Sequence, residues 1–514
     1  MNPSPSSPRS PTDVRRRPTP GVILAVVSFG VFIAADDLTV VSTMLRQIIG
    51  DLGIPLPEGF DRAAWIVNSY LVAYVAVMPF MGRLSDVIGR RRVYLGSLAL
   101  FLIGSIWIPL APNLSWFIAG RVITAIGGGA MVPVALAIIG DVYEERWRPR
   151  ALGVLGAIDT IGWVWGPLFG ALLVRFLDWR WQFHLNIPLA AIGMAVTWWA
   201  LRDHDRPRGR RRIDWPAAVT LSASLVCLNV GLVNTGQISG VSELAELTGD
   251  TSVPTVPFFV AAAISFALFL WFESRSRDPL IDLRLFRAPN FAPAILVNFL
   301  VGAVLIIAMV DVPLFVNLVV ETNLEKAAVL SGWTLSALTA SMAIAAYAGG
   351  RLTEATWYRP VVIGGLVFAA AGFLVMGLTW DEDVGLGQMA WTLVLLGIGF
   401  GVVTAPTNAA AVDAVPADRR GVAGGLVILA RLMGLAVGLS GLTAWALHRF
   451  DTLRRTIDLP SLDSPDYQDA FEQAQAGLTS SALGETFLFA AALAAAAIPV
   501  SLWLRRRSSP LESP

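Results

Sequence analysis

Six ionisable residues stand inside long apolar runs of this sequence. They are Asp36, Asp37, Arg121, Asp159, Asp311 and Arg431. A charge in an apolar medium costs free energy, so such residues usually face a protein interior or a wet cavity and carry function. Burial also disfavours the charged form of a carboxyl group, which brings it into the range where it can exchange protons. These residue types therefore predict proton binding together with buried ion pairs.

The two adjacent acids, Asp36 and Asp37, have different expected roles. Asp37 is our first candidate for a proton carrier, and Arg121 could stabilise the charged form of a nearby acid in one conformation only. Successive helical residues are about 100° apart around the axis. Asp36 is therefore expected to meet solvent or a different partner.

The other three charges lie further along the chain. Asp159 and Arg431 are expected to pair between two helices. The sequence leaves open whether that pair is a fixed salt bridge or one that forms in one state and breaks in another. Asp311 and Arg431 would supply charge to the second half of the chain.

The segments that must position these residues are membrane spans. Of the 514 residues, 55% are hydrophobic and 15% are charged, whereas soluble proteins carry about 25% charged residues. Many apolar runs are long enough to cross a bilayer. The sequence thus predicts an all-α integral membrane protein with 14 transmembrane helices. The expected spans are 21–45, 63–82, 93–111, 115–139, 151–176, 183–201, 215–235, 255–273, 291–318, 327–349, 360–379, 388–412, 421–448 and 483–504.

The spans divide into two sets of six with a pair between them, which favours repeated halves around a midplane binding site. Basic residues mark one side of the membrane: most of the 38 Lys and Arg fall in segments that share a side if both termini are cytoplasmic. We therefore expect a multi-pass protein of the cell (inner) membrane. The expected division is a disordered cytoplasmic tail at 1–19, a six-helix half at 20–202, linkers and two inserted helices at 203–290, a second six-helix half at 291–507, and a cytoplasmic tail at 508–514.

The loop after the second span has the order G-x-L-x-D-x-x-G-R-R-R. Its glycines allow tight turning, and its acid can pair with neighbouring arginines or with a helix end. An ordinary basic loop on the cytoplasmic side would not need this order. The residues that define it are Gly82, Asp86, Gly89, Arg90 and Arg91.

The stretch 153–170 combines glycines at helical spacing with the acid Asp159. Gly162 and Gly166 are four residues apart and share a helix face, so a neighbouring helix can approach closely. Pro167 removes one backbone donor and marks a bend. The spacing pattern comprises Gly153, Gly162, Gly166, Pro167 and Gly170.

These motifs resemble those of the major facilitator superfamily, and the resemblance covers nearly the whole chain. The loop at 82–92 is similar to the superfamily's hallmark loop. The run 121–129 looks like its R-x-x-x-G-x-G element, whose arginine is linked to proton transfer. The stretch 153–170 fits the antiporter signature G-x8-G-x3-G-P-x2-G-G except that Ala171 replaces the last glycine.

The resemblance extends to one branch of the superfamily. The run 37–40, the run 179–183 and the run 186–188 match the fourteen-helix drug:proton antiporters. The runs 41–46, 65–67, 310–315 and 430–434 look like the mycobacterial lipoprotein-associated triacylglycerol exporters. Two positions depart from those exporters. Thr160 stands where they have a glutamate, with Asp159 beside it, and 350–354 is a degenerate copy of the hallmark loop.

The resemblance implies a proton-coupled antiporter that exports an apolar or amphipathic substrate, with lipid such as triacylglycerol as the first choice. Its partners would be protons, membrane lipid and a periplasmic lipoprotein. Multidrug efflux is the alternative. A non-transporting membrane receptor or enzyme is disfavoured, because no catalytic constellation accompanies the predicted bundle.

A polar, helically patterned segment at 448–484 favours lipid as the substrate. It would extend the last two helices beyond the outer face as a hairpin able to shield an acyl chain, because a helix from about 421 to 458 exceeds the ~30 Å hydrocarbon core.

Several functional classes are excluded. His184, His204 and His448 lack metal-ligand spacing, and no phosphate-binding glycine loop indicates ATP hydrolysis. The net charge is zero, which gives no field suited to nucleic acid. We expect no metal, no cofactor and no nucleic-acid partner.

Overall fold

The computed structural model describes residues 18–54, 60–202, 213–234, 255–276, 278–321, 324–381, 383–454 and 467–505. Fourteen helices of 18 residues or more make up most of this part of the chain. They are α1 (Pro20–Asp51), α2 (Phe60–Ile88), α3 (Arg90–Trp107), α4 (Leu114–Val142), α5 (Arg148–Phe176), α6 (Arg180–Ala200), α7 (Trp215–Asn234), α9 (Val256–Arg275), α10 (Phe291–Phe315), α11 (Leu324–Ala355), α12 (Tyr358–Thr379), α13 (Leu386–Asp413), α14 (Arg420–Arg454) and α15 (Tyr467–Ser501).

The prediction of an all-helical membrane fold is confirmed. Twelve of these helices are long and apolar enough to cross a membrane. The other two, α6 and α11, contain more polar residues and fall short of that criterion, so the count of fourteen spans stays a prediction. No strand occurs among the described residues.

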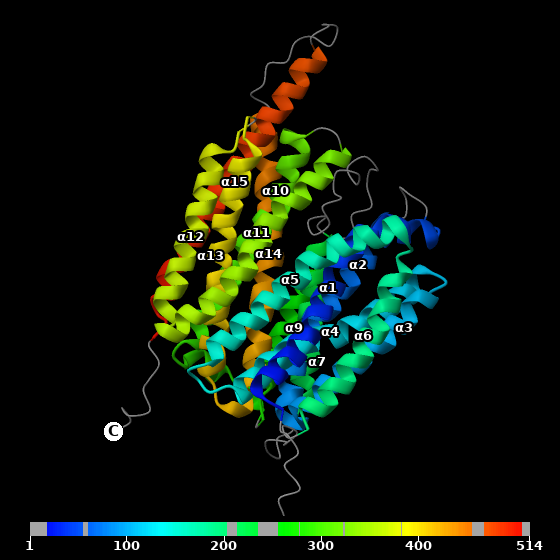
Figure 1. Ribbon diagram of the computed structural model, residues 1–514, viewed down its shortest axis with the longest axis vertical. Coiled ribbons are helices and arrows are strands. Elements are labelled where there is room, and N and C mark those ends of the chain that lie inside the picture. The colour runs from blue at the N-terminus through cyan, green and yellow to red at the C-terminus, as the bar shows by residue number, and fades with distance from the viewer. Residues whose placement is uncertain are drawn as a thin grey trace, which may run out of the picture.

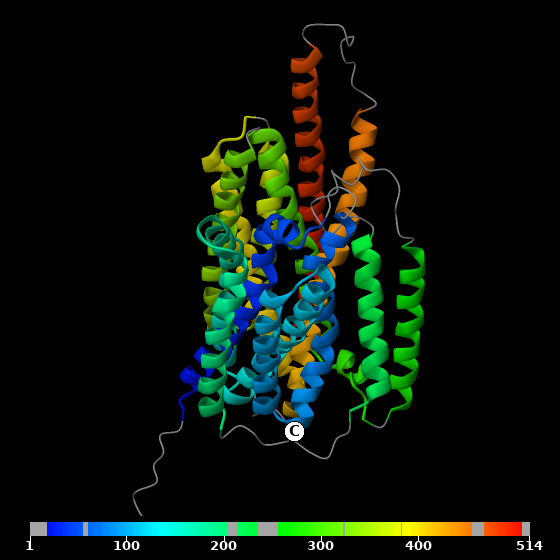
Figure 2. The same ribbon diagram turned by 90° about the vertical axis from the view of Figure 1, so that its right-hand side faces the viewer.

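The helices pack in two groups that lie side by side at different inclinations (Figure 1). In the first group α1 packs on α5, and α4 packs on α2 and α3. In the second, α13 packs on α11 and α12, while α14 packs on α10. Contacts between the groups run chiefly through α5 on α11 and through α14 on α2 and α4. The helices α7 and α9 pack on each other, and α7 also packs against α2. Figure 2 shows α7 and α9 as a pair at the side of the bundle.

The helices α14 and α15 extend beyond the other helices at one end of the bundle (Figure 2). The helix α14 continues to Arg454, and α15 begins at Tyr467. The expected apex of the hairpin lies outside the described residues. So do the first 17 residues, most of the arginine-rich linker at 202–212, and the loop at 235–254.

Candidate functional site

The most deeply buried charges join α1 and α4. The Asp37 carboxylate in α1 lies 2.8 Å from Nη1 of Arg121 in α4, and both side chains are 0% exposed. Asn186 of α6 donates a hydrogen bond to the other carboxylate oxygen of Asp37, at 3.1 Å. Two buried charges are tolerated when they are paired and hydrogen-bonded. The sequence-predicted residues Asp37 and Arg121 are therefore brought together as a closed ion pair.

Asp36 has its own partner. The Gln182 side chain on α6 donates a hydrogen bond to Oδ2 of Asp36 at 2.7 Å. The second oxygen, Oδ1, is buried and has no hydrogen-bond partner among the described residues. The two adjacent acids thus contact different side chains, as their angular separation on the helix requires.

Two tyrosines of α2 connect this ion pair to the centre of the molecule. The Arg121 guanidinium lies 4.2 Å from the centroid of the Tyr70 ring, a cation–π contact. The ring of Tyr70 stacks on that of Tyr74, with 5.6 Å between centroids. Tyr74 in turn lines a cavity between the two helix groups together with Asp159.

Side chains from both groups of helices line this central cavity. Its volume is about 50 Å³, which is room for a few water molecules and too small for a lipid. Its wall is mostly apolar. The lining residues are Tyr74, Val132, Asp159, Thr160, Trp163, Leu305, Met309, Leu338, Thr339, Met342, Ile428, Arg431 and Leu435.

Asp159 and Arg431 both line the cavity, but no salt bridge joins them. Within the described residues, the polar contact of the Arg431 guanidinium is a 3.1 Å hydrogen bond that it donates to Oδ1 of Asn298 on α10. Asp159 and Arg431, which were expected to pair, therefore line the same cavity without direct contact in this conformation.

Asp311 lies apart from the other five charges. It is buried between α10 and α15, where the Thr486 hydroxyl donates a hydrogen bond to its Oδ2 at 2.6 Å. It is not among the residues that line the central cavity.

The glycine–arginine loop forms a clamp between the two helix groups. The Asp86 carboxylate accepts hydrogen bonds from the backbone N–H groups of Gly421 (3.0 Å) and Val422 (3.1 Å) at the start of α14. It also pairs with Arg90. A carboxylate at the first turn of a helix meets unsatisfied N–H donors and the positive end of the helix dipole. The loop thereby fixes one end of α2 against α14.

Further residues of the loop and its surroundings reinforce the clamp. Asp141 at the end of α4 accepts from Arg90 on one side (3.2 Å) and from Arg420 on the other (3.1 Å). Gly82 lies directly against the main chain of Gly421. The other two motif residues, Gly89 and Arg91, have local roles: Gly89 precedes α3 with a φ of 107°, and Arg91 donates to the Trp198 carbonyl at 3.0 Å.

Comparison with known proteins decides the family. The model of the Major Facilitator Superfamily matches residues 27–439. The chain belongs to the major facilitator superfamily.

Relatives within the major facilitator superfamily span most of this chain. The chain is 34% identical over 446 residues to the triacylglyceride transporter of Mycobacterium tuberculosis (strain ATCC 25618 / H37Rv). The matched residues cover 84% of this chain and 84% of the relative. It is 33% identical over 447 residues to the probable triacylglyceride transporter of Mycobacterium leprae (strain TN), covering 84% of this chain and 85% of the relative.

Solved structures of major facilitator proteins share the fold. The human organic anion transporter MFSD10 superposes with a TM-score of 0.59 at 16% identity, covering 93% of this chain and 100% of that one. The proton:xylose symporter XylE superposes with a TM-score of 0.58 at 13% identity, covering 92% and 94%.

The stretch 153–170 of this major facilitator protein bridges the two helix groups. A Cβ atom at Gly166 would lie 2.8 Å from the Asp36 carbonyl oxygen, so the glycine allows α5 to lie against α1. A Cβ atom at Gly153 would lie 2.7 Å from the Ala346 carbonyl oxygen, so there α5 lies against α11. Gly162 and Gly170 also face α1, and Pro167 lies inside α5.

Four residues that surround Asp36, Asp37 and Arg121 were missed by reasoning from the sequence. Tyr70 and Tyr74 have the i, i+4 spacing of one helix face in a span that otherwise looks like ordinary apolar core. Gln182 and Asn186 have the same spacing in α6 and hold the two acids of α1. Polar residues paired at i, i+4 in an apolar run were the available signal in both helices.

Proposed function

We propose that this major facilitator transporter is a proton-coupled antiporter that exports an apolar or amphipathic substrate, with lipid such as triacylglycerol as the first candidate. The observation that carries the coupling proposal is the buried Asp37–Arg121 pair, which contacts the cavity wall through Tyr70 and Tyr74. A proton on Asp37 removes the charge that holds Arg121. The guanidinium is then left buried without its counter-ion, a costly state that favours rearrangement.

Asn186 helps Asp37 in both protonation states. Its amide donates to the charged carboxylate at 3.1 Å, and after rotation its carbonyl oxygen can accept from the protonated acid. Asp37 is therefore the proton site of the proposed cycle, with Asn186 as a positioning residue. The distance between the charges of Asp159 and Arg431 changes in this cycle when the cavity between the two halves opens.

The proposed alternating access uses the clamp and the cavity. Contacts from Asp86 to α14 close one end of the molecule, which the sequence assigns to the cytoplasmic side. Opening that end requires these contacts to break, and the halves then rock about the α5–α11 and α2–α14 contacts. The proposed halves are residues 20–202 and 291–507, with the pair α7 and α9 as an insertion.

Two observations favour lipid as the substrate. The cavity wall is mostly apolar, and the mycobacterial relatives carry the name triacylglyceride transporter. The extension of α14 and α15 would receive the lipid on the outer side, where a periplasmic lipoprotein would take it over. An apolar cavity with one acid also suits amphipathic drugs, so multidrug efflux is the competing proposal.

Proton coupling is tested by Asp37→Asn in inverted membrane vesicles carrying an imposed proton gradient. The amide keeps the shape of the side chain but cannot carry the proton, so gradient-driven uptake should fall to background. The matched control is Asp178→Asn, which changes a partly exposed acid on the loop before α6 that pairs with Arg180. Full gradient-driven uptake by Asp37→Asn would refute the assignment of Asp37.

The substrate is tested by shortening the segment 450–482. If the extension shields an acyl chain, lipid export should fail while efflux of small dyes largely survives. The opposite result, dye efflux lost and lipid export intact, would refute the idea that the extension serves lipid export. The proposed orientation, with both termini cytoplasmic in the cell (inner) membrane, is tested by reporter fusions at the two ends.

A further inference from the structure

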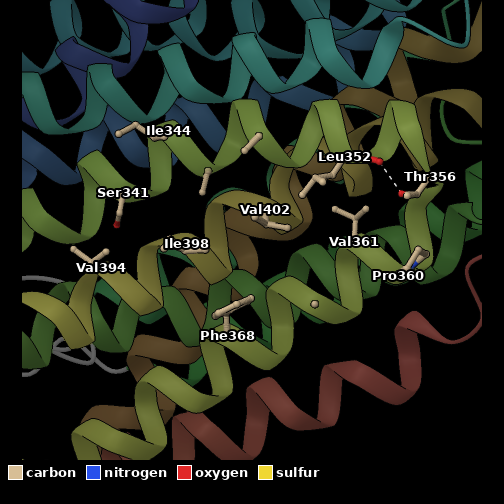
Figure 3. Close-up of a pocket in the computed structure, with 13 residues that line it drawn as sticks. Ser341, Ile344, Leu352, Thr356, Pro360, Val361, Phe368, Val394, Ile398 and Val402 are labelled. Atoms are coloured by element: carbon tan, nitrogen blue, oxygen red, sulfur yellow. Dashed lines mark hydrogen bonds between the residues drawn. The ribbon is translucent and has the colours of Figure 1, made fainter.

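A long groove runs along the outer surface of the second helix group. The helices α11 and α12 both pack closely on α13 but hardly contact each other, which leaves a groove of about 660 Å³ between them. Figure 3 shows Ile344 and Leu352 of α11, Phe368 of α12 and Val402 of α13 around it. Ile344 is 72% exposed, so the groove opens outward and not into the central cavity.

The hydroxyl groups that line the groove already donate hydrogen bonds within their own helix. The groove's two polar lining residues are Ser341 and Thr356. The Ser341 hydroxyl donates to the Leu338 carbonyl at 2.8 Å, and the Thr356 hydroxyl donates to the Leu352 carbonyl at 2.6 Å (Figure 3). A membrane-facing groove whose hydroxyls are already satisfied by their own helix suits a hydrocarbon chain.

A basic pocket lies next to one end of the groove. It has a volume of about 420 Å³ and lies between the start of α12 and the end of α15. Arg359 and Arg505 line it together with Trp357 and Trp503. Within the described part of the chain, neither arginine takes part in a salt bridge. The Arg505 backbone is held by Asn290, which accepts from its N–H at 2.6 Å.

The two cavities meet at consecutive residues. Arg359 lines the basic pocket, and Pro360 lines the end of the groove. Tryptophans gather at the level of lipid headgroups, and basic pockets between membrane helices bind anionic headgroups. The pocket therefore suits a phosphate at the level of the lipid headgroups, and the adjoining groove suits an acyl chain.

We infer that one anionic phospholipid binds here, with its phosphate between Arg359 and Arg505 and one acyl chain in the groove between α11 and α12. Free phosphate would satisfy the arginines alone but would leave the groove without an occupant. The bound lipid fills the gap between two helices that have few direct contacts. This site faces away from the cavity between the halves, so the inference does not depend on the proposed transport function.

The headgroup is tested with the purified full-length chain by native mass spectrometry after addition of phosphatidylglycerol or phosphatidylcholine. The wild type should retain one more phosphatidylglycerol than phosphatidylcholine. Arg359→Ala/Arg505→Ala should weaken retention of that lipid at least tenfold, since each basic residue near the surface contributes about 1 kcal/mol. The control Arg351→Ala removes an exposed arginine of α11 that does not line the pocket.

Equal retention of phosphatidylglycerol by the wild type and the double variant would overturn the inference. An equal loss in Arg351→Ala would also overturn it, because it would indicate a general effect of surface charge. Inorganic phosphate at millimolar concentration should not displace the lipid. If phosphate alone raises the melting temperature as much as phosphatidylglycerol does, the site binds free phosphate and the lipid assignment is wrong.

The groove is tested separately by Gly364→Leu. A Cβ atom at Gly364 meets nothing within 4 Å, so the larger side chain occupies the groove without disturbing the helix packing. Retention of phosphatidylglycerol should fall severalfold while both arginines remain. Gly96→Leu is the matched control, because Gly96 is also the seventh residue of its helix, α3, and is equally open. Unchanged retention in Gly364→Leu would refute the acyl-chain placement.

Discussion

Two sets of buried charges in this transporter are held in opposite ways. Asp37 and Arg121 form a closed pair with 2.8 Å between their charged atoms. Asp159 and Arg431 share a cavity wall without direct contact. The first set lies within one group of helices, on α1 and α4, whereas the second joins α5 of one group to α14 of the other. A rearrangement of the halves therefore changes the distance between the second pair much more than that between the first.

The difference assigns separate roles to the two sets. A closed ion pair in a dry interior responds to protonation, because removing one charge leaves the other uncompensated. Two opposite charges across a small cavity respond to geometry, because their attraction rises steeply as they approach. We expect the first set to bind the proton and the second to report the opening of the cavity. Four changes test this division.

The largest effect is expected from Arg121→Met. It leaves the Asp37 carboxylate buried without its counter-ion, which destabilises a protein by about 3–5 kcal/mol. The double variant Asp37→Asn/Arg121→Met should recover much of that loss, because no uncompensated charge remains. Unfolding in mixed micelles would measure both. If the double variant is no more stable than Arg121→Met alone, the two charges are not energetically coupled.

A smaller effect is expected from Asp86→Asn at the clamp. The amide cannot pair with Arg90 and accepts less strongly from Gly421 and Val422, so the closed end should lose roughly 1–3 kcal/mol. The cavity should then open more often at that end. Cys227 is the chain's single cysteine, so it is first replaced by Ser. Labelling of a cysteine introduced at Thr339, which lines the cavity, should then become several times faster in Asp86→Asn.

The control for the clamp is Glu144→Gln, which neutralises an exposed acid close to Asp141 in the chain. Labelling at Thr339 should stay at the wild-type rate in this variant. The same acceleration in both variants would mean that net charge, and not the contacts with α14, keeps the end closed.

The cavity charges should show little mutual coupling in this conformation. Arg431→Met loses the hydrogen bond to Asn298 and should cost about 1–2 kcal/mol. Because no ion pair joins Arg431 to Asp159 but both line one cavity, a double-mutant cycle with Asp159→Asn should give a coupling energy of only about 0.5–1 kcal/mol. A coupling as large as that of Asp37 with Arg121 would show that the cavity pair is closed in the stable state, as a fixed bridge would be.

Much of the fold could be predicted from the sequence, because membrane spans are set by long apolar runs. Each expected span overlaps one long helix, although several overrun its end by up to four residues, and the continuation of α14 beyond its apolar part followed from its pattern. The helices α6 and α11 show the limit of that reasoning. Both carry polar residues that serve contacts inside the protein, as Asn186 does, and these residues lower the apolarity by which a span is recognised.

The candidate site could be predicted only in part. A charge in an apolar run costs free energy and is therefore a functional candidate, which is why Asp37 and Arg121 were selected from the sequence. Tyr70 is compatible with an apolar core, and its contact with Arg121 depends on how α2 and α4 are rotated. The gap between Asp159 and Arg431 depends on the position of two whole helix groups. No local pattern encodes either of these quantities.

The smallest effect is expected at a second ion pair on α1, which differs from the first mainly in exposure. Asp51 lies 2.7 Å from Arg180, but the two side chains are 39% and 31% exposed. Hydrogen bonds from the Arg180 guanidinium and the Trp179 indole lower the pKa of Asp51. A lowered pKa stabilises the fold above the unfolded value near 4, and this contribution is lost as the pH falls through the folded value. Solvent screening limits it to under about 1 kcal/mol.

Asp51→Asn should therefore lower stability slightly at neutral pH, and the difference from the wild type should shrink as the pH falls below about 4, as measured by melting curves at neutral pH and at pH 3. The same helix then carries one pair that controls stability and another that hardly matters, although their charged atoms are almost equally far apart. If Asp51→Asn were as damaging as Arg121→Met, burial would not be the property that distinguishes the two pairs. The argument that a dry, closed pair makes Asp37 the proton site would then lose its physical basis.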